Sequence, residues 1–269
     1  MTSEIVSVKD LTLRFGERTL WQNMNFELGA GEFLAVLGPN GTGKTSLLRI
    51  LLGILAPTSG RVAVRGRPPR CCAALGYIPQ QRIFDRDTSL RARDFVRLGV
   101  DGHRWGVSVL SRKQRERIDG VLAEVGASSF ADAAMGRLSG GEQQRLRVAQ
   151  ALVSDPAVLL ADEPLLSLDL SYQRIITELL DSRRRRFGTP ILFVTHDINP
   201  ILPVVDRVLY LAPGRWAIGT ADEVLTSEVL SSLYETEVDV LRVRGRIVVV
   251  GTPEDHGSHH VHAHGDMSV

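Results

Sequence analysis

The chain has 269 residues, 43% of them hydrophobic and 23% charged, with a formal net charge of +1 at pH 7. This composition suits a globular protein with a full core, and the near-neutral charge argues against a nucleic-acid-binding protein that works by bulk electrostatics. No signal-peptide pattern or bilayer-length apolar run is visible, and the two cysteines are neighbours that form no disulfide framework, so we expect a reducing cytoplasm and no membrane span.

The first predicted elements are strands at an edge, followed by the parts of a phosphate site. Ile5–Leu13 and Leu20–Leu28 alternate apolar and polar residues, as antiparallel edge strands do, and Arg61–Val64 is a further strand. Phe33–Leu37 is a short apolar strand that runs into a glycine-rich turn, and the leucines of Thr45–Leu55 recur at helical spacing. Strand, glycine loop and helix is the order that a phosphate site requires.

The middle of the chain predicts an inserted helical subdomain. It is rich in arginine and shows helical patterns at about residues 89–98 and 111–125, followed by one amphipathic helix over residues 141–154. We therefore place a helical subdomain at about residues 85–150.

The last third of the chain predicts the rest of a sheet and a tail. The expected elements are strands at Ala157–Ala161, Pro190–Thr195, Val208–Leu211, Arg215–Ile218 and within Val240–Val250, and a helix at Tyr172–Phe187. The run Arg183–Arg186 lies near the end of that helix, where cations are favourable, and we expect it to be a solvated face. Residues 252–269 have little to bury, so they predict a disordered, His-rich tail after a domain of residues 1–251.

Gly38–Thr45 has the spacing of a phosphate-binding loop, Gly-Pro-Asn-Gly-Thr-Gly-Lys-Thr. In such a loop the glycines let backbone N–H groups turn towards phosphate oxygens, Lys44 reaches the β- and γ-phosphates, and the Thr45 hydroxyl binds Mg²⁺. An ordinary glycine turn is the alternative, which the flanking strand and helix disfavour. The residues expected to bind the nucleotide here are Gly38, Pro39, Asn40, Gly41, Thr42, Gly43, Lys44, Thr45 and Ser46.

The strand Ala157–Ala161 ends in two acidic residues, Asp162 and Glu163. Ligand sites of open α/β sheets lie at the carboxyl ends of the strands. We therefore expect Asp162 to hold Mg²⁺, directly or through water, and Glu163 to polarise the attacking water as general base. Solvated acids at a strand end are common by themselves, and the phosphate loop upstream favours the catalytic interpretation.

Leu138–Arg145, with the sequence Leu-Ser-Gly-Gly-Glu-Gln-Gln-Arg, predicts a second anion site. A Ser-Gly-Gly turn that opens a helix offers a hydroxyl, free N–H groups and the positive end of the helix dipole. One nucleotide does not need two such sites from one chain, so we expect each site to complete the pocket of a partner copy. A plain capped helix start is the alternative. The residues assigned to this half-site are Ser139, Gly140, Gly141 and Glu142.

Together the three motifs resemble the ATP-binding-cassette (ABC) ATPase family, in the family's order and over nearly all of residues 5–220. Leu138–Gln143 resembles the family signature, which other phosphate-loop ATPases lack. The resemblance implies an α/β fold in which a phosphate-loop ATPase core carries an antiparallel β edge subdomain and an inserted α-helical subdomain. Residues 1–251 would then be an ABC nucleotide-binding domain, with ATP and Mg²⁺ as cofactors and ATP hydrolysis coupled to transmembrane transport.

The resemblance also assigns single residues. Phe15 matches the aromatic residue that stacks on adenine, with a core aromatic as the alternative. Gln80 matches the glutamine that senses Mg²⁺ and the attacking water, and Gln81 beside it leaves the register open. Asp169 matches the loop that crosses the dimer interface, and His196 matches the switch histidine that contacts the γ-phosphate. The residues thus expected to act in hydrolysis are Glu163, His196 and Gln80, with Thr45, Gln80 and Asp162 at Mg²⁺.

The family resemblance further implies partners and a location. Two copies close head-to-tail on two ATP molecules, so the expected assembly is a homodimer. A separate transmembrane permease would bind near the Gln80 loop and the helical subdomain, and an extracytoplasmic substrate-binding protein would belong to the same system. We expect the chain to act as a peripheral subunit on the cytoplasmic side of the cell membrane.

Two features point to a metal as the transported substrate. Neutral imidazole binds Zn²⁺, Ni²⁺ or Cu²⁺, and the possible ligands of the tail are His256, His259, His260, His262 and His264, with a solvated tail as the alternative. His196–Pro200, Asp206–Leu211, Ile218–Thr220 and Val240–Arg242 resemble the branch of zinc and manganese importers. We therefore expect an importer subunit for one of these metals. The alternatives are an importer of another small solute and a soluble ABC ATPase without a transport role.

Overall fold

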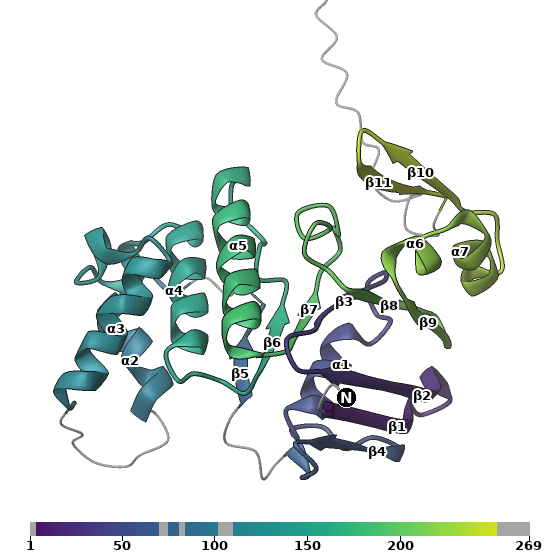
Figure 1. The fold of residues 1–269 in the computed structure, drawn as a ribbon, viewed down its shortest axis with the longest axis horizontal. Coiled ribbons are helices and arrows are strands. Elements are labelled where there is room, and N and C mark those ends of the chain that lie inside the picture. The colour runs from purple at the N-terminus through teal and green to yellow at the C-terminus, as the bar shows by residue number, and fades with distance from the viewer. Residues whose placement is uncertain (1–3, 70–74, 81–83, 102–109, 252–269) are drawn as a thin grey trace, which may run out of the picture.

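The computed structural model describes residues 4–69, 75–80, 84–101 and 110–251. Its central layer, among these residues, is a six-stranded sheet in the order β5-β6-β7-β3-β8-β9 (Figure 1). The neighbours from β5 to β8 pair in parallel and β9 pairs antiparallel to β8. The strands are β3 (Phe33–Leu37), β5 (Leu75–Ile78), β6 (Val158–Asp162), β7 (Ile191–Val194), β8 (Arg207–Ala212) and β9 (Arg215–Gly219).

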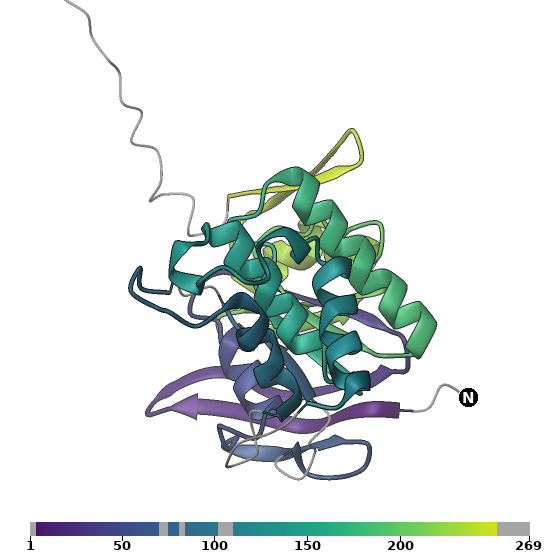
Figure 2. The ribbon, with the colours of Figure 1, turned by 90° about the vertical axis from the view of Figure 1, so that its left-hand side faces the viewer.

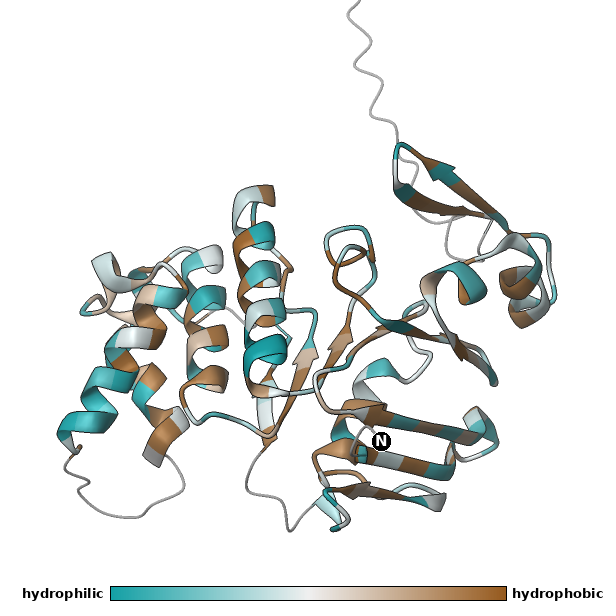
Figure 3. Ribbon diagram, in the orientation of Figure 1, coloured by the Kyte–Doolittle hydropathy of each residue, from teal (hydrophilic) through white to brown (hydrophobic). Residues whose placement is uncertain are grey.

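The inner strands are buried on both faces, as the central strands of a covered parallel sheet must be. Phe33 and Ala35 of β3 belong to one hydrophobic core, and the alternating Leu34 and Val36 belong to a second core. Figure 3 shows apolar residues concentrated along these strands. The sheet is therefore the wall between two cores, and the site described below lies at the ends of its parallel strands.

One face of the sheet is covered by α1 (Lys44–Leu51) and by a second, three-stranded sheet in the order β2-β1-β4. Its antiparallel strands are β1 (Glu4–Phe15), β2 (Arg18–Gly29) and β4 (Ser59–Val64). Figure 2 shows this sheet at the base of the molecule. The two edge strands predicted from alternation are confirmed. The predicted helix Thr45–Leu55 is shorter than expected, because the chain turns at Gly53, which has a positive φ of 72°.

The opposite face is covered by helices, with α2 (Ala92–Asp101), α3 (Arg112–Glu124) and α4 (Gly140–Leu152) in the region predicted to be helical, and α5 (Leu170–Phe187) beside them (Figure 1). Two short turns, η2 (Ser128–Phe130) and η3 (Met135–Arg137), lie between α3 and α4. The helix α4 differs from the amphipathic pattern expected of it. Its polar side chains Gln143, Gln144 and Arg147 are buried along with its apolar ones, because α4 packs against α2, α3 and β5.

The arginine run near the end of α5 corrects the expectation of a solvated face. Arg183 and Arg184 are buried, at 9% and 7% exposure. Arg184 pairs with Asp206 at 2.8 Å and donates to the carbonyl oxygens of Gly31 and Val204. Arg184 therefore fastens α5 to loops at the end of the central sheet, and Arg183 pairs instead with Glu124 of α3 and with Asp155.

The C-terminal part of the described chain, called the C-terminal unit from here on, packs on the main core beside β8 and β9. It comprises α6 (Ala221–Val224), α7 (Ser227–Tyr234) and an antiparallel hairpin of β10 (Asp239–Val243) and β11 (Arg246–Val250). Strand structure within Val240–Val250 was expected, but α6, α7 and β5 were not. Asn199 fixes the hairpin, because its side-chain amide donates to the carbonyl of Ile247 at 3.0 Å and accepts from its N–H at 2.8 Å.

The His-rich tail, residues 252–269, lies outside the described residues, and so does Gln81. None of the described helices combines the length and the apolar character that a membrane crossing needs.

Candidate nucleotide-binding and hydrolysis site

The loop between β3 and α1 requires glycine at two positions. At Gly38, where φ is 136°, a Cβ would lie 2.1 Å from the carbonyl oxygen of Leu211. At Gly43, where φ is 96°, a Cβ would lie 2.7 Å from the indole nitrogen of Trp21. Gly43 is also the N-cap residue of α1 and has no side chain with which to cap the helix. The first N–H groups of α1 are therefore suited to receive an anion.

Lys44 is folded over the loop that precedes it. Its ammonium group donates to the carbonyl oxygens of Gly38 at 2.5 Å and Pro39 at 2.8 Å, and the side chain of Thr42 also donates to Pro39, at 2.9 Å. Lys44 is 7% exposed. A positive charge is thus held beside the glycine loop by two carbonyl oxygens, at a position from which it can reach a phosphate bound by the N–H groups of the loop.

The acidic end of β6 lies against this loop. The hydroxyl of Thr45 donates to Asp162 Oδ2 at 3.1 Å. Asp162 is 2% exposed, and this burial raises the pKa of its carboxyl; the charge of Glu163 adds to the rise, whereas the Thr45 hydrogen bond and Lys44 oppose it. A hydroxyl and a carboxylate are the hard oxygen ligands that Mg²⁺ prefers, so the donor set fits this ion.

Glu163 and His196 lie at the ends of the neighbouring strands β6 and β7. Glu163 Oε2 is 3.5 Å from His196 Nδ1. The Glu163 side chain is 13% exposed and that of His196 is 62% exposed, so the histidine is open to solvent while the carboxylate is sheltered. The strand order therefore brings together two residues that were predicted from separate motifs.

A cavity of about 360 Å³ joins most of the predicted residues. It is lined by Phe15, Arg18, Leu20, Asn40, Gly41, Gly43, Lys44, Thr45, Ser46, Gln80, Asp162 and Glu163. Phe15 is 53% exposed, which excludes the alternative of a core aromatic residue. Arg18 and Leu20 were not predicted. Arg18 pairs with Phe15 across the hairpin turn and donates to the carbonyl of Gly41 at 3.0 Å. The short turn after Phe15 could therefore have predicted that Arg18 lies beside the nucleotide cavity.

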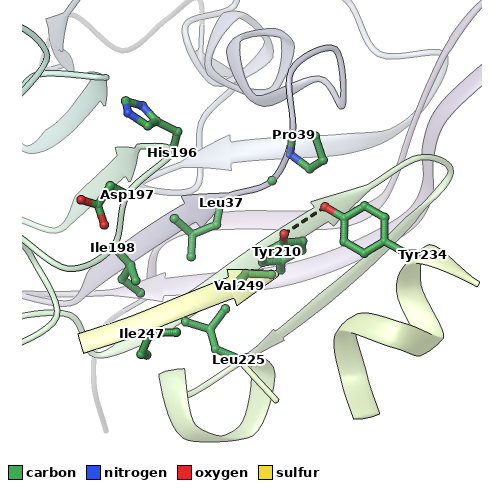
Figure 4. Close-up of a pocket in the computed structure, with 11 residues that line it drawn as sticks. Leu37, Pro39, His196, Asp197, Ile198, Tyr210, Leu225, Tyr234, Ile247 and Val249 are labelled. Atoms are coloured by element: carbon green, nitrogen blue, oxygen red, sulfur yellow. Dashed lines mark hydrogen bonds between the residues drawn. The ribbon is translucent and has the colours of Figure 1, made fainter. Parts of the chain in front are cut away.

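A second cavity, of about 240 Å³, lies beside the first and is bordered by Gly38, Pro39 and His196 (Figure 4). Its opposite wall comes from the C-terminal unit, with Tyr234 of α7 hydrogen-bonded to Tyr210 of β8 at 2.9 Å. One cavity is therefore lined by the nucleotide-binding loop, the loop that carries His196 and the C-terminal unit.

The predicted half-site Ser139–Glu142 does not line the nucleotide cavity. It begins α4, which lies apart from α1 in Figure 1. The Ser139 hydroxyl accepts from the N–H of Glu142 at 3.3 Å, and the Glu142 carboxylate accepts from the N–H of Ser139 at 2.8 Å, which together form a capping box. A Cβ at Gly141 would lie 3.6 Å from the carbonyl of Ser167, so this turn adjoins the loop that leads to Asp169.

Asp169 is engaged within its own chain. It caps α5 by accepting from the N–H groups of Ser171 and Tyr172, both at 3.0 Å. A hydrogen bond from the Ser171 hydroxyl, followed by these backbone bonds, lowers the pKa of its carboxyl. The interface role of Asp169 stays a prediction.

The parallel sheet, the glycine loop and the acid pair define a phosphate-loop ATPase. Residues 21–166 match the family model described as ABC transporter. The match covers the loop, Gln80, the Ser139–Glu142 turn and the acid pair, and it ends before Asp169 and His196. The chain belongs to the ABC transporter family, as its ATP-binding ATPase subunit.

Solved structures of similar fold include several members of the same family. An ABC transporter described as of metal-chelate type, in an inward-facing conformation, has 27% identity and a TM-score of 0.77, over 92% of this chain and 96% of that one. CbiO1 of Clostridium perfringens, part of the ABC transporter complex CbiONQ, has 27% identity and a TM-score of 0.68, over 85% and 93%. The cassette MJ0796, solved as a dimer bound to ADP and Pi, has 28% identity and a TM-score of 0.69, over 79% and 98%.

Proposed function

We propose that two copies of this chain close head-to-tail on two ATP molecules and hydrolyse them at sites that both copies share. The observation that supports this proposal most strongly is the separation of the two anion-binding turns. Lys44, Asp162 and Glu163 line one cavity, whereas Ser139–Glu142 begins a helix away from it. A second copy, turned to face the first, brings its own Ser139–Glu142 to that cavity. The dimer of the similar cassette MJ0796 supports this arrangement.

Each residue of the cavity has a role in this proposal. The N–H groups of Gly38–Thr45 and the ammonium group of Lys44 bind the phosphates, and the exposed ring of Phe15 stacks on adenine. Thr45, Asp162 and Gln80 hold Mg²⁺, which neutralises phosphate charge when it is bound. Thr45 offers a hydroxyl, Asp162 a carboxylate and Gln80 an amide, and all three side chains line the same cavity.

Hydrolysis requires a water held in line with the γ-phosphate. Glu163 orients and polarises that water as general base, and His196, 3.5 Å from its carboxylate, contacts the γ-phosphate. Ser139 and Gly141 of the second copy contact the same phosphate, and Asp169 lies at the interface between the copies. ATP therefore holds the dimer closed, and hydrolysis releases it.

The variant Glu163→Gln tests this proposal, because it keeps the size and hydrogen-bonding ability of the side chain and removes the base. We expect it to bind ATP, to remain a dimer in ATP on size-exclusion chromatography, and to hydrolyse ATP barely. Lys44→Ala serves as the control that neither binds ATP nor dimerises. Wild-type turnover by Glu163→Gln contradicts the role of Glu163, and a monomer in ATP contradicts the shared site.

The work done by this dimer is proposed to be import of a transition metal ion, zinc or manganese, through a separate transmembrane permease supplied by an extracytoplasmic substrate-binding protein. The chain would bind the permease from the cytoplasmic side of the membrane as a peripheral subunit. Similarity to an ABC transporter of metal-chelate type supports a metal-containing substrate. The test is uptake by proteoliposomes that hold the chain and its co-purified permease, with Zn²⁺, Mn²⁺ and a metal chelate compared. Uptake of the chelate alone, or of no metal, overturns the proposal of a free ion.

The tail is proposed to bind metal weakly on the same side of the membrane, after a nucleotide-binding domain of residues 1–251. Zn²⁺ and Mn²⁺ are titrated by calorimetry into the full chain and into a chain that ends at Gly251. We expect weak binding by the full chain only. Equal binding by both chains rules out a role of the tail histidines.

A further inference from the structure

The side chain of Gln144 reaches the loop that carries Glu163. Gln144 is in the first half of α4 and has 0% exposure. Its amide nitrogen donates to the carbonyl oxygen of Pro164 at 2.9 Å, in a fully buried hydrogen bond. Pro164 is the residue directly after Glu163, so one buried bond connects α4 to the backbone next to the proposed general base.

The backbone of Glu163 needs such support. Its φ of 48° lies in the left-handed region, which costs a residue with a side chain on the order of 1–3 kcal/mol and persists only where surrounding contacts hold it. The N–H of Glu163 donates to the carbonyl of Val194 at 2.9 Å, and its carbonyl accepts from Leu166 at 3.2 Å. Proline has no N–H, so its carbonyl is the single backbone hydrogen-bonding group at residue 164. The side-chain amide of Gln144 donates its hydrogen bond to this carbonyl.

The orientation of the Gln144 amide is itself constrained. Its oxygen faces Arg147 Nη1, one turn further along α4, at 3.5 Å. Because a guanidinium group only donates, it requires the amide oxygen on its side and leaves the amide nitrogen for Pro164. Loss of this bond would cost free energy, because the buried Pro164 carbonyl would then have no water molecule as a hydrogen-bond donor.

From these contacts we propose that Gln144 is a positioning residue for hydrolysis, which fixes the Glu163 carboxylate by holding the carbonyl of Pro164. This inference rests on the proposed role of Glu163 as general base. Ser139 begins the same helix, so α4 also connects the half-site offered to the second copy with the water-activating residue of its own copy.

The neighbouring Gln143 provides a matched control. It is equally buried, with 1% exposure, and it also makes side-chain hydrogen bonds to backbone groups. Its partners are the N–H of Phe84 and the carbonyls of Met135 and Leu138, none of which belongs to the loop after β6. A variant of Gln143 therefore loses a comparable set of buried bonds without releasing Pro164.

The experiment compares Gln144→Met with Gln143→Met in ATP hydrolysis and thermal unfolding. Methionine keeps the length of the side chain and removes the amide. We expect both variants to unfold at lower temperature. Gln144→Met should lose about 10- to 100-fold more in kcat than Gln143→Met, at an unchanged KM for ATP, as misplacement of a catalytic group does. If Gln144→Met does not fold, Gln144→Asn, which shortens the amide by one methylene, is measured in the same way.

A double variant separates positioning from mere stability. In a single-turnover assay with radiolabelled ATP, adding Gln144→Met to Glu163→Gln should slow the residual hydrolysis no further, because Gln144 acts through the carboxylate that is already absent. Equal losses on both backgrounds, a rise in KM alone, or an unchanged kcat in folded Gln144→Met overturn the inference. Failure of the proposed function would show earlier, as normal turnover by Glu163→Gln alone.

Discussion

The beginnings of α1 and α4 are two helix N-termini with opposite chemistry. The helix α1 starts after Gly43, which offers no capping side chain, and its first turn carries Lys44 and no acidic residue. The helix α4 starts at Ser139 with a complete capping box, and its first turn carries Glu142. Both ends have the positive pole of a helix dipole. The first has no capping side chain, whereas the capping box of the second already uses the N–H group of Glu142.

This difference supports the roles proposed for the two turns, in which one holds a phosphate and the other completes the site. At α4 the Glu142 carboxylate already accepts from the N–H and from the hydroxyl of Ser139, both at 2.8 Å, and partly neutralises the dipole. A phosphate that arrives there competes with a carboxylate. In the proposed function, the turn at Ser139 binds a γ-phosphate only when Lys44 and Gly38–Thr45 of another copy present it.

The largest expected effect comes from removing the charge at the α1 turn. Lys44→Ala should lower kcat/KM for ATP by about 10³-fold, the scale reported for loss of one preorganised donor to a developing negative charge. Its binding of a fluorescent ATP analogue should fall in parallel, because Lys44 contacts the ground-state phosphates as well. If Lys44→Ala still bound the analogue tightly, the α1 turn would not depend on the charge of Lys44, and the proposed difference between the two turns would be wrong.

A smaller effect is expected at the α4 turn. Ser139→Ala removes the acceptor of one capping bond and should lower the free energy of unfolding by about 1 kcal/mol. It should leave binding of ATP by the single chain unchanged and should weaken the dimer that forms in ATP. Light scattering in the presence of ATP measures the fraction of dimer, with Ser139→Ala combined with Glu163→Gln so that the ATP is not hydrolysed. An unaltered dimer would make Ser139 a cap and nothing more.

The acidic residue beside the α1 turn predicts a pH effect. Burial raises the pKa of Asp162, so between the ordinary pKa and the raised one the folded state binds more protons than the unfolded state. The free energy of unfolding therefore falls as pH rises through that window, and the loss persists at neutral pH. Asp162→Asn should unfold at a higher temperature than wild type at pH 7 without nucleotide, with a difference that shrinks below the ordinary pKa.

The same variant should lose Mg²⁺-dependent hydrolysis, because an amide does not replace the carboxylate as a ligand. Melting curves of both proteins across a pH series measure the stability difference, and an assay of ATP hydrolysis with and without Mg²⁺ measures the loss of activity. A lower melting temperature of Asp162→Asn at pH 7 would show that burial of the charge is fully compensated in the nucleotide-free protein.

The smallest expected effect belongs to Glu142→Gln. Glutamine completes a capping box as glutamate does, so the melting temperature should hardly change. Removal of the carboxylate charge at the helix start should tighten the ATP-bound dimer about 2- to 5-fold, given dipole and charge effects of about 0.3–1 kcal/mol. Weaker dimerisation would mean that Glu142 contributes more than a cap.

The sequence was sufficient where the information is local. Gly38–Thr45 and the acid pair follow from residues adjacent in the chain. Lys44 and Thr45 of that loop line one cavity with the acid pair, Phe15 and Gln80. The order of the strands in the sheet then decides which of the residues at the strand ends lie next to each other. The contact between Glu163 and His196 depends on β6 and β7 being neighbours, and the resemblance to the family was needed to anticipate a role for His196.

The features that sequence reasoning missed depend on distant partners. Arg184 is polar in any periodicity analysis, and it is buried because Asp206 and the Gly31 loop come to it from elsewhere in the chain. Gln144 likewise looks like a surface residue of an amphipathic helix until Pro164 is placed against it. The short helices α6 and α7 were missed because four and eight residues carry too little periodicity to stand out.

Complementation between two impaired variants tests the central claim most directly. When Lys44→Ala and Ser139→Ala chains pair, a shared-site dimer places both defects in one site and leaves the other site entirely wild type. ATP occlusion and hydrolysis by the mixture should therefore exceed those of either variant alone, and mixing Lys44→Ala with itself provides the baseline. A mixture no more active than the average of its two components would contradict a nucleotide site built from Gly38–Thr45 of one copy and Ser139–Glu142 of the other.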